Sequence, residues 1–300
     1  MAQPAHLEPS KLGTREYWDA LYTTEIANHA HDPSDTGTAW FDDSDAEAKL
    51  LEFLEEPERA QELGLNTTTT SFLDLGTGNG ALLFALRDAG WQGPMLGVDY
   101  SAQSVRFARR IERARRKEGD VEEEEDEATN GEGEAGEDDD ADVNFAEHDI
   151  LHTPASALLD ARFSSSIVDG WDVILDKGTF DAISLSAETV DGAENANTAT
   201  DGIGARPRRI NEAYGIHILP LVREGGLFLI TSCNWTEAEL RSWFEGGDVL
   251  QDMPTASENQ EPIRWGFEVV GRIEYRSFSF GGAKGQTISS LCFRKVRKSR

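Results

Sequence analysis

The stretch Ser71–Leu86, which reads SFLDLGTGNGALLFAL, decides how the rest of the chain is interpreted. Its first part is short and mostly apolar, which is typical of a buried strand, and its last part has the composition of a helix. Between them stand Gly76, Gly78 and Gly80, and glycine lets a backbone turn tightly or approach a ligand closely. A strand, a glycine loop and a helix in this order predict the first unit of a doubly wound α/β sheet, with a ligand at the loop.

The same alternation continues along the chain. Further strands are expected at residues 95–99, 143–146, 171–176 and 227–232, with helices between them. A helix capped by Ser101 should run to Arg116, and residues 11–54 form a helical arm before the first strand. Two strand-like segments, 267–280 and 287–296, flank a glycine-rich run and predict an antiparallel hairpin. We therefore expect a Rossmann-like, seven-strand α/β sheet with five parallel strands, a C-terminal antiparallel hairpin and helices on both faces.

Two polar stretches interrupt this pattern. Residues 118–142 hold 15 acidic residues and neither lysine nor arginine, so they cannot bury enough apolar surface to offset the entropy of ordering. We expect a disordered acidic insertion there, and a flexible loop at 188–207, which is rich in Asn, Thr, Gly and Ala. The expected organisation is an N-terminal helical arm and lid over residues 1–65, followed by one domain over residues 66–300 that carries both stretches.

The charge of the chain argues against nucleic acid as a partner. The formal net charge is −28, and because the acidic insertion contributes 15 negative charges, the rest of the chain still carries −13. Such a protein repels phosphate backbones and attracts basic partners. The two cysteines suggest no disulfide framework and the six histidines have no ligand spacing, so no metal is expected. We find neither a secretory signal nor an apolar run long enough for a membrane span, which predicts a cytoplasmic protein.

Acidic residues stand at or near the ends of the first three expected strands. Asp99 lies about twenty positions beyond the glycine loop, where it can accept hydrogen bonds from ribose hydroxyls. Asp149 could bind an adenine amino group with Ile150 covering the ring, or it could be a helix N-terminal acid in the following loop. The loop also satisfies the dinucleotide pattern G-x-G-x-x-A, but Asp74 would repel a pyrophosphate and would suit the ammonium of the methionine moiety in S-adenosylmethionine. The expected residues of an S-adenosylmethionine site are Asp74, Gly76, Gly78, Gly80, Asp99, Asp149 and Ile150.

Polar candidates for catalysis follow the fourth and fifth strands. Asp176 leaves a strand at the turn DKGTFD, where it would stand between cofactor and substrate. Methyl transfer is an in-line displacement, so the protein mainly aligns donor and acceptor, and a carboxylate could orient or deprotonate an attacking amine. The alternatives for Asp176 are a helix cap or an ion pair with Lys177. Asn234, after the fifth strand, would face the same cleft.

Aromatic residues offer a candidate substrate channel. Trp40 and Phe41 form an exposed-looking pair after the turn at Gly37, and they suit a lid or a channel. Their alternative role is a hydrophobic anchor for the N-terminal arm. Trp235 would face the cleft beside Asn234, although core packing alone would also explain it.

Several of these segments together resemble a known family. They are Ser10–Asp19, Trp40–Phe41, Asp74–Gly80, Asp176–Asp181 and Thr231–Thr236. They look like segments of the fungal and animal methyltransferases that modify a lysine of translation elongation factor 1-alpha. The resemblance covers nearly the whole chain outside the two polar stretches, and its most specific parts are the N-terminal segment and the run TSCNWT.

That resemblance implies a seven-strand fold and a cytoplasmic, S-adenosylmethionine-dependent protein-lysine N-methyltransferase. It further implies mono- and dimethylation of elongation factor 1-alpha, with a suggested link to intracellular transport, and we expect a monomer. Other functions stay open on the residues alone. They are methylation of another protein or a small molecule, NAD-dependent oxidoreduction at the same loop, and a non-catalytic binding module that holds basic partners through residues 118–142.

Overall fold

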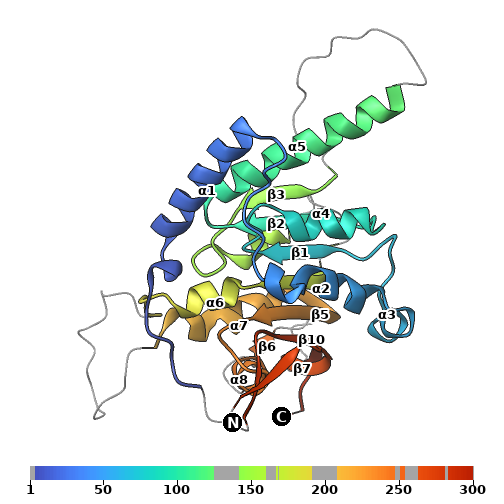
Figure 1. The fold of residues 1–300 in the computed structure, drawn as a ribbon. Coiled ribbons are helices and arrows are strands. Elements are labelled where there is room, and N and C mark those ends of the chain that lie inside the picture. Colours follow the sequence, from blue (N-terminus) through green and yellow to red (C-terminus); the bar gives the residue numbers. More distant parts are fainter. Residues whose placement is uncertain are drawn as a thin grey trace.

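A mixed sheet of eight strands runs through the part of the chain that the structure describes (Figure 1). This computed structural model describes residues 4–124, 142–159, 167, 169–190, 208–246, 251–253, 263–280 and 283–299. The strands are β1 (Phe72–Leu75), β2 (Met95–Asp99), β3 (Asn144–Glu147), β4 (Trp171–Lys177), β5 (Val222–Ser232), β6 (Gln251–Met253), β7 (Ile263–Ile273), β8 (Ser277–Phe280), β9 (Ala283–Gln286) and β10 (Ser289–Arg297). The α-helices are α1 (Arg15–His31), α2 (Ala46–Glu55), α3 (Pro57–Leu63), α4 (Ala81–Asp88), α5 (Ala102–Glu124), α6 (Thr179–Ser184), α7 (Tyr214–Ile218) and α8 (Glu237–Phe244). Short 3-10 helices are η1 (Lys11–Gly13), η2 (Asp42–Ser44), η3 (Ala155–Leu158), η5 (Ile210–Ala213) and η6 (Leu219–Leu221).

The strand order in space is β3-β2-β1-β4-β5-β10-β7-β6. Strands β1 to β5 pair in parallel, and β10 and β7 follow in antiparallel pairing. This confirms the expected five parallel strands with an antiparallel C-terminal pair. The chain builds one half of the sheet outward from β1 and then returns to place β4 on the other side of it, so a topological switch point lies between β1 and β4.

The C-terminal hairpin is more elaborate than the sequence pattern predicted. The expected strand 267–280 is two strands, because β7 ends at Ile273 and β8 begins at Ser277. Strands β8 and β9 pair with each other as a separate small sheet, and β6 adds a short edge strand beside β7. The prediction of one continuous strand was wrong because neither glycine nor proline stands between Ile273 and Ser277 to mark the break.

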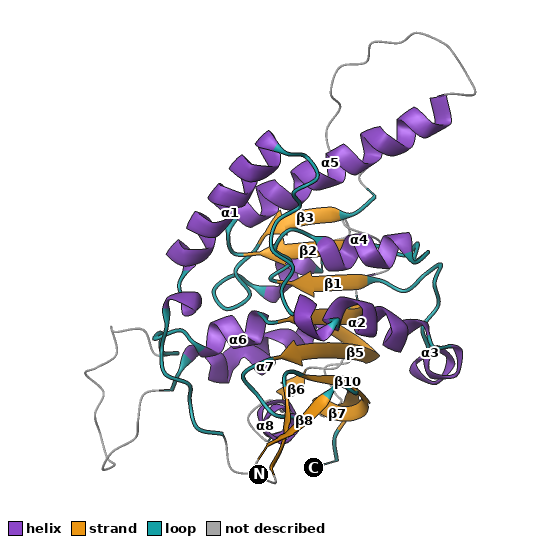
Figure 2. Cartoon of the chain, viewed as in Figure 1, coloured by secondary structure: helices purple, strands orange, loops and turns teal. Residues whose placement is uncertain are grey.

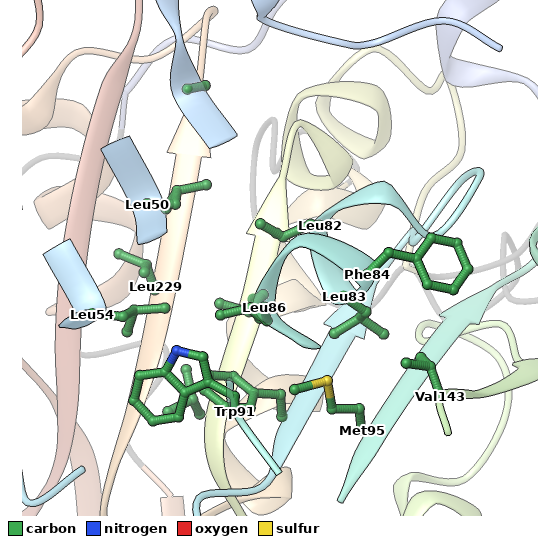
Figure 3. Close-up of a cluster of buried hydrophobic side chains, with 14 of the residues drawn as sticks. Leu50, Leu54, Leu82, Leu83, Phe84, Leu86, Trp91, Met95, Val143 and Leu229 are labelled. Atoms are coloured by element: carbon green, nitrogen blue, oxygen red, sulfur yellow. The ribbon is translucent and has the colours of Figure 1, made fainter. Parts of the chain in front are cut away.

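Alternation along the strands sends side chains into two separate cores. Phe72 of β1 and Leu229 of β5 lie on one face of the sheet, under α2, α4 and α5, whereas their neighbours Leu73 and Phe228 lie on the other face, under α6, α7 and α8. Figure 3 shows the first of these cores, where leucines of α2 and α4 gather with Trp91 beside the strands. Because both faces are covered, the central strands β1 and β2 are buried along their whole length, as βαβ architecture requires.

Two helix predictions needed correction. Helix α5, which Ser101 caps through its Oγ, continues beyond Arg116 to Glu124, so the first seven residues of the expected disordered insertion are helical. Glutamate is a good helix former, and composition alone does not mark the end of such a helix. The rest of the insertion, residues 125–141, and residues 191–207 of the expected flexible loop lie outside the described residues.

The N-terminal arm is likewise not one helix. Helix α1 ends at His31 and α2 begins at Ala46, and the segment between them includes Pro33 and the left-handed Gly37. Helix α1 lies alongside α5 (Figure 2), so the arm is packed onto the sheet domain. Among the described residues, we find no helix with the length and apolar composition that a membrane crossing needs.

Candidate functional site

A cavity of about 740 Å³ opens at the carboxyl ends of the parallel strands. Its walls come from the glycine loop after β1, the ends of β2 and β4, the turn after β3, and the N-terminal arm. Open α/β sheets bind ligands at this edge, next to the point where the strand order reverses. The volume lies within the range of cofactor and small-molecule sites. Among the described residues, no group of three histidine, cysteine or acidic side chains is arranged to hold a metal ion.

The glycine loop brings backbone into the cavity where side chains could not fit. Gly76 and Gly78 line the cavity and have positive φ values of 62° and 60°. A Cβ on Gly76 would lie 2.1 Å from the Thr179 hydroxyl, and one on Gly78 would lie 2.8 Å from the Tyr22 hydroxyl. Gly80 differs from the other two, because it precedes α4 and packs against Phe145 without lining the cavity.

Asp74 lies at the bottom of this loop, inside β1. Its side chain lines the cavity although the residue is only 3% exposed. Burial raises the pKa of Asp74 to about 7, against the opposing effect of the nearby Lys177 ammonium. A carboxyl group in this state gains most from a cationic partner, because a positive charge offsets the cost of burying its negative one.

Asp99 ends β2 and is tied to the same loop. One carboxylate oxygen accepts hydrogen bonds from the Gly78 amide at 3.2 Å and the Ser104 hydroxyl at 2.7 Å, and the other accepts from the Ser101 amide at 2.9 Å. The side chain also lines the cavity. Asp99 therefore holds the loop in shape and still presents acceptor capacity to a ligand.

Asp149 lies just after β3, on the wall of the cavity. Its carboxylate accepts hydrogen bonds from the Leu151 and His152 amides at 3.0 and 3.2 Å, and it lies 3.0 Å from Nδ1 of His152. It therefore begins a turn, whereas the next helix, η3, begins only at Ala155, and it lines the cavity together with the apolar Ile150.

Asp176 lies elsewhere than the sequence suggested. It is 1% exposed and does not line the cavity. Its carboxylate accepts hydrogen bonds from the amides of Thr179 and Phe180 at the start of α6, and from the Tyr214 hydroxyl at 2.6 Å. Asp176 is therefore a helix cap, as the alternative interpretation predicted. The prediction that it stands between cofactor and substrate was wrong, because its side chain does not reach the cavity.

Lys177 and Asp181 take the positions that Asp176 was expected to hold. Successive residues of a strand point to opposite faces of the sheet. Lys177 lines the cavity, and the preceding Asp176 therefore points to the other face. Asp181, on α6, also lines the cavity, and its carboxylate accepts hydrogen bonds from the Ser232 hydroxyl and from the Cys233 and Asn234 amides at 2.8 and 3.4 Å. Burial raises the pKa of Asp181. Asn234 lines the cavity, as predicted, and Asp181 holds the turn that carries it.

The aromatic candidates separate into two groups. Trp40 and Phe41 line the cavity, as a channel or lid requires, and the Trp40 ring lies 5.4 Å from that of Trp18. Phe41 has a φ of 66°, a left-handed conformation that costs free energy for a bulky side chain. Trp235 was wrongly placed in the channel. It is 3% exposed, packs near Trp243, and donates its indole N–H to the Ser184 hydroxyl.

The N-terminal arm completes the cavity, which the sequence did not indicate residue by residue. Helix η1 lies directly on the end of α6, where a Cβ on Gly13 would approach the Leu185 backbone to 2.2 Å. The Ser10 amide donates to the Leu185 carbonyl at 3.0 Å, and Trp18 donates its indole N–H to the Leu12 carbonyl at 2.8 Å. The arm is thus a wall of the site.

The charged residues of the cavity wall are mostly acidic. The acidic ones are Glu16, Asp43, Glu47, Asp74, Asp99, Asp149, Asp181 and Glu188, whereas the lysines and arginines are Arg15 and Lys177. Such a wall attracts a cation and repels a phosphate. This acidic wall, the glycine loop, Asp99 at the end of β2 and the antiparallel strand β10 together define the class of the protein. The fold and the site are those of an S-adenosylmethionine-dependent methyltransferase and do not suit a dinucleotide enzyme.

Comparison with known proteins agrees with this class. The family described as a methyltransferase domain matches residues 66–271. The chain is 35% identical over 296 residues to the protein-lysine N-methyltransferase EFM4 of Saccharomyces cerevisiae, a match that covers 98% of this chain and 99% of that protein. It is 32% identical to the Schizosaccharomyces pombe protein-lysine N-methyltransferase efm4 (96% and 95% covered), and 28% identical to human EEF1A lysine methyltransferase 2 (96% and 88% covered). A solved structure of magnesium protoporphyrin IX methyltransferase from Synechocystis with bound SAM aligns over 99% of this chain and 100% of that one, at 14% identity and a TM-score of 0.45.

The chain belongs to the family of protein-lysine N-methyltransferases that includes the two yeast proteins. S-adenosylmethionine is its cofactor. The cavity fits that molecule, because Gly76 and Gly78 present backbone to it and the buried Asp74 carboxyl favours a cationic partner.

Proposed function

We propose that this protein methylates a lysine of translation elongation factor 1-alpha. The vertebrate relatives carry that substrate in their names, and the matches to them and to the yeast proteins extend over at least 96% of this chain. The observation that carries the proposal is the wall of the cavity. It is built partly from the N-terminal arm and is dominated by carboxylates, which suits a lysine side chain.

The cofactor-facing roles follow from the charge and position of each group. S-adenosylmethionine supplies an electrophilic methyl group when it is bound. Asp74 would accept from the ammonium of its methionine moiety, and Asp99 would accept from the ribose hydroxyls. Asp149 would accept from the adenine amino group, and Ile150 would cover the ring. Each of these side chains lines the cavity, which supports the assignment.

The lysine-facing roles fall to Asp181 and Asn234. A lysine amine must be neutral to attack, and deprotonation from a pKa near 10.4 costs about 4–5 kcal/mol at pH 7. Asp181 can lower this cost by orienting the amine and taking up its proton, and its raised pKa suits that task. The Asn234 side chain can orient the same amine. Asp176 acts one step away, because it caps the helix that carries Asp181.

Trp40 and Phe41 would flank the aliphatic part of the lysine. An apolar wall disfavours the ammonium form and excludes water from the reacting amine. The contact between Trp40 and Trp18 connects this wall to α1, which supports a lid formed by the arm. We extend the proposal to mono- and dimethylation in the cytoplasm by a single chain.

Methyl transfer to purified elongation factor tests the proposal. Unmethylated elongation factor 1-alpha, produced in a bacterium, is incubated with this protein and isotopically labelled S-adenosylmethionine, and the labelled lysine is located by mass spectrometry. Asp181→Asn should remove most of the label while S-adenosylhomocysteine still binds in calorimetry, whereas Asp74→Asn should weaken both. A preparation that binds S-adenosylhomocysteine but labels only other cytosolic proteins would overturn the substrate and leave the enzyme class intact.

A further inference from the structure

Lys177 is a half-buried cation that has no role yet in the proposed chemistry. It ends β4 and lines the cavity, near Asp74 at the glycine loop and near Trp40 and Glu47 of the N-terminal arm. Its ammonium donates to the Trp40 carbonyl at 3.3 Å, and no carboxylate among the described residues lies within salt-bridge distance of it. An ammonium that is partly removed from water and has one neutral acceptor loses solvation without a compensating charge, so an anionic partner would stabilise it.

The surroundings of Lys177 point to the kind of anion that it receives. Asp74 and Glu47 are close enough to raise the pKa of Lys177, while burial lowers it. An anion that carried only negative charge would be repelled by these two carboxyl groups. A zwitterion would not be, because its cationic end can face Asp74 while its anionic end faces the ammonium.

We propose that Lys177 binds the carboxylate of the cofactor's methionine moiety, so that Asp74 and Lys177 form a two-point site for an α-amino acid group. Asp74 lies in β1 just before the glycine loop, and Lys177 ends the neighbouring β4. The two side chains reach the cavity from adjacent parallel strands at the switch point, so sheet pairing sets their separation. The proposal rests on the cofactor alone and holds whichever protein is methylated.

The same geometry gives Lys177 a second effect. The Trp40 carbonyl that accepts its hydrogen bond belongs to the aromatic lid. A carboxylate that binds the Lys177 ammonium would therefore lie next to the hydrogen bond to Trp40. The same side chain would then contact both the cofactor and the lid. A role as a lid tether alone is the competing explanation, and it predicts no preference for ligands that carry a carboxylate.

The test compares two ligands that differ only in this carboxylate. Calorimetry at pH 7.5 gives the affinities of S-adenosylhomocysteine and of its decarboxylated analogue S-adenosyl-3-thiopropylamine for the full chain. The wild-type protein should prefer S-adenosylhomocysteine by about 10- to 100-fold, as expected for a charge-assisted hydrogen bond. Lys177→Met and Lys177→Gln should reduce that ratio to near one, chiefly by weakening S-adenosylhomocysteine.

Arg15→Met is the matched control, because Arg15 is the other arginine or lysine on the cavity wall and is paired with Glu147 outside it. It should keep the wild-type ratio. A ratio of affinities that stays unchanged in the Lys177 variants would overturn the proposal, and if both affinities fall equally, Lys177 is a lid tether. A ratio that also falls to near one in Arg15→Met would overturn the proposal as well. Thermal unfolding without ligand checks that each variant is folded, and the Gln variant replaces Met if Met does not fold.

Discussion

Glycines and acidic residues contribute to the site in different ways. A glycine matters through its backbone conformation and the space around it, and Asp74 matters through its charge. Gly76 has both a left-handed backbone and a close neighbour, whereas Gly90 has a φ of 90° and no atom within 4 Å of the place a Cβ would take. Asp74 has little exposure and a pKa that burial raises to about 7. These contrasts make matched substitutions informative.

Gly76→Ala should damage the site, and Gly90→Ala should not. An alanine at either position carries the left-handed penalty of about 1–2 kcal/mol. At Gly76 the added Cβ also displaces the Thr179 hydroxyl from the Leu75 carbonyl, to which it donates at 2.6 Å. Calorimetry should show S-adenosylhomocysteine binding weakened by at least about tenfold for Gly76→Ala only. Equal affinities in the two variants, once each is shown to be folded, would contradict this account of the loop.

The affinity for S-adenosylhomocysteine should rise with pH up to about 7 and then level off. Below that value the Asp74 carboxyl is protonated and neutral, so binding the ligand's ammonium first requires loss of a proton. The expected slope is about a tenfold loss of affinity per pH unit below the pKa. Asp74→Asn should bind weakly with a flat profile between pH 6 and 8. A wild-type profile that is flat over the same range would show that Asp74 is already ionised or is not the partner.

The two tryptophan candidates predict opposite phenotypes. Trp235 is buried among aromatic side chains, so Trp235→Ala should lower the free energy of unfolding by about 3–5 kcal/mol. Trp40 is half-buried on the cavity wall, so Trp40→Ala should cost about 1 kcal/mol of stability but raise the KM for the protein substrate. Chemical denaturation and steady-state kinetics separate the two. A destabilised Trp40→Ala with normal KM would assign that residue to the core as well.

At the scale of elements, the N-terminal arm and α6 act as one unit. Helix η1 packs backbone to backbone against the end of α6, and α6 carries Asp181 into the cavity. Asp176 caps the first turn of α6 and Asp181 accepts from the turn after β5. A change in the arm is therefore transmitted to the lysine-facing side of the site through a short helix, with no change in any group that faces the substrate.

Gly13→Ala should loosen the arm from α6. A Cβ at 2.2 Å from the Leu185 carbonyl carbon cannot be accommodated without a shift, and overpacking of this kind costs about 1–3 kcal/mol. Limited trypsin digestion should cut faster after Lys11 and Arg15, which flank this contact, and the KM for the protein substrate should rise. Ser10→Ala, which removes the cap of η1 but keeps the contact, is the control. Digestion rates equal to the wild type would show that the arm is not held by this packing.

At the scale of the whole molecule, charge sets how fast a basic substrate arrives. The net charge of −28 is partly concentrated in residues 118–142, but the cavity wall is acidic on its own account. Steered association is screened by salt because the Debye length shrinks from about 10 Å at 0.1 M as ionic strength rises. Recognition of the elongation factor should therefore depend on salt far more than cofactor binding does.

Raising potassium chloride from 50 to 300 mM should lower kcat/KM for elongation factor 1-alpha on the order of tenfold. The affinity for S-adenosylhomocysteine should change little, because that ligand is small and nearly neutral overall. Deleting residues 125–141, which removes nine carboxylates, should flatten the salt dependence while activity at high salt is kept. Complete loss of methylation on deletion would favour the acidic stretch as the substrate-binding module itself.

Sequence alone determined where the parallel strands lie along the chain, the glycine loop, and the acids Asp74, Asp99 and Asp149. These features are local. A strand that ends in a carboxylate before a glycine turn is recognisable without knowing what packs around it. It also determined the separate C-terminal antiparallel pair, although not the break at Ile273, since no residue marks it.

Only the tertiary structure decided which side of β4 and which side of α6 face the cavity. Both faces of a parallel sheet are covered and apolar, so the pattern around Asp176 and Lys177 does not tell which of the two residues enters the site. The fold sends Asp176 to the cap of α6 and brings Lys177 and Asp181 to the wall. It also buries Trp235, because the packing of α8 against the sheet depends on contacts between residues far apart in sequence.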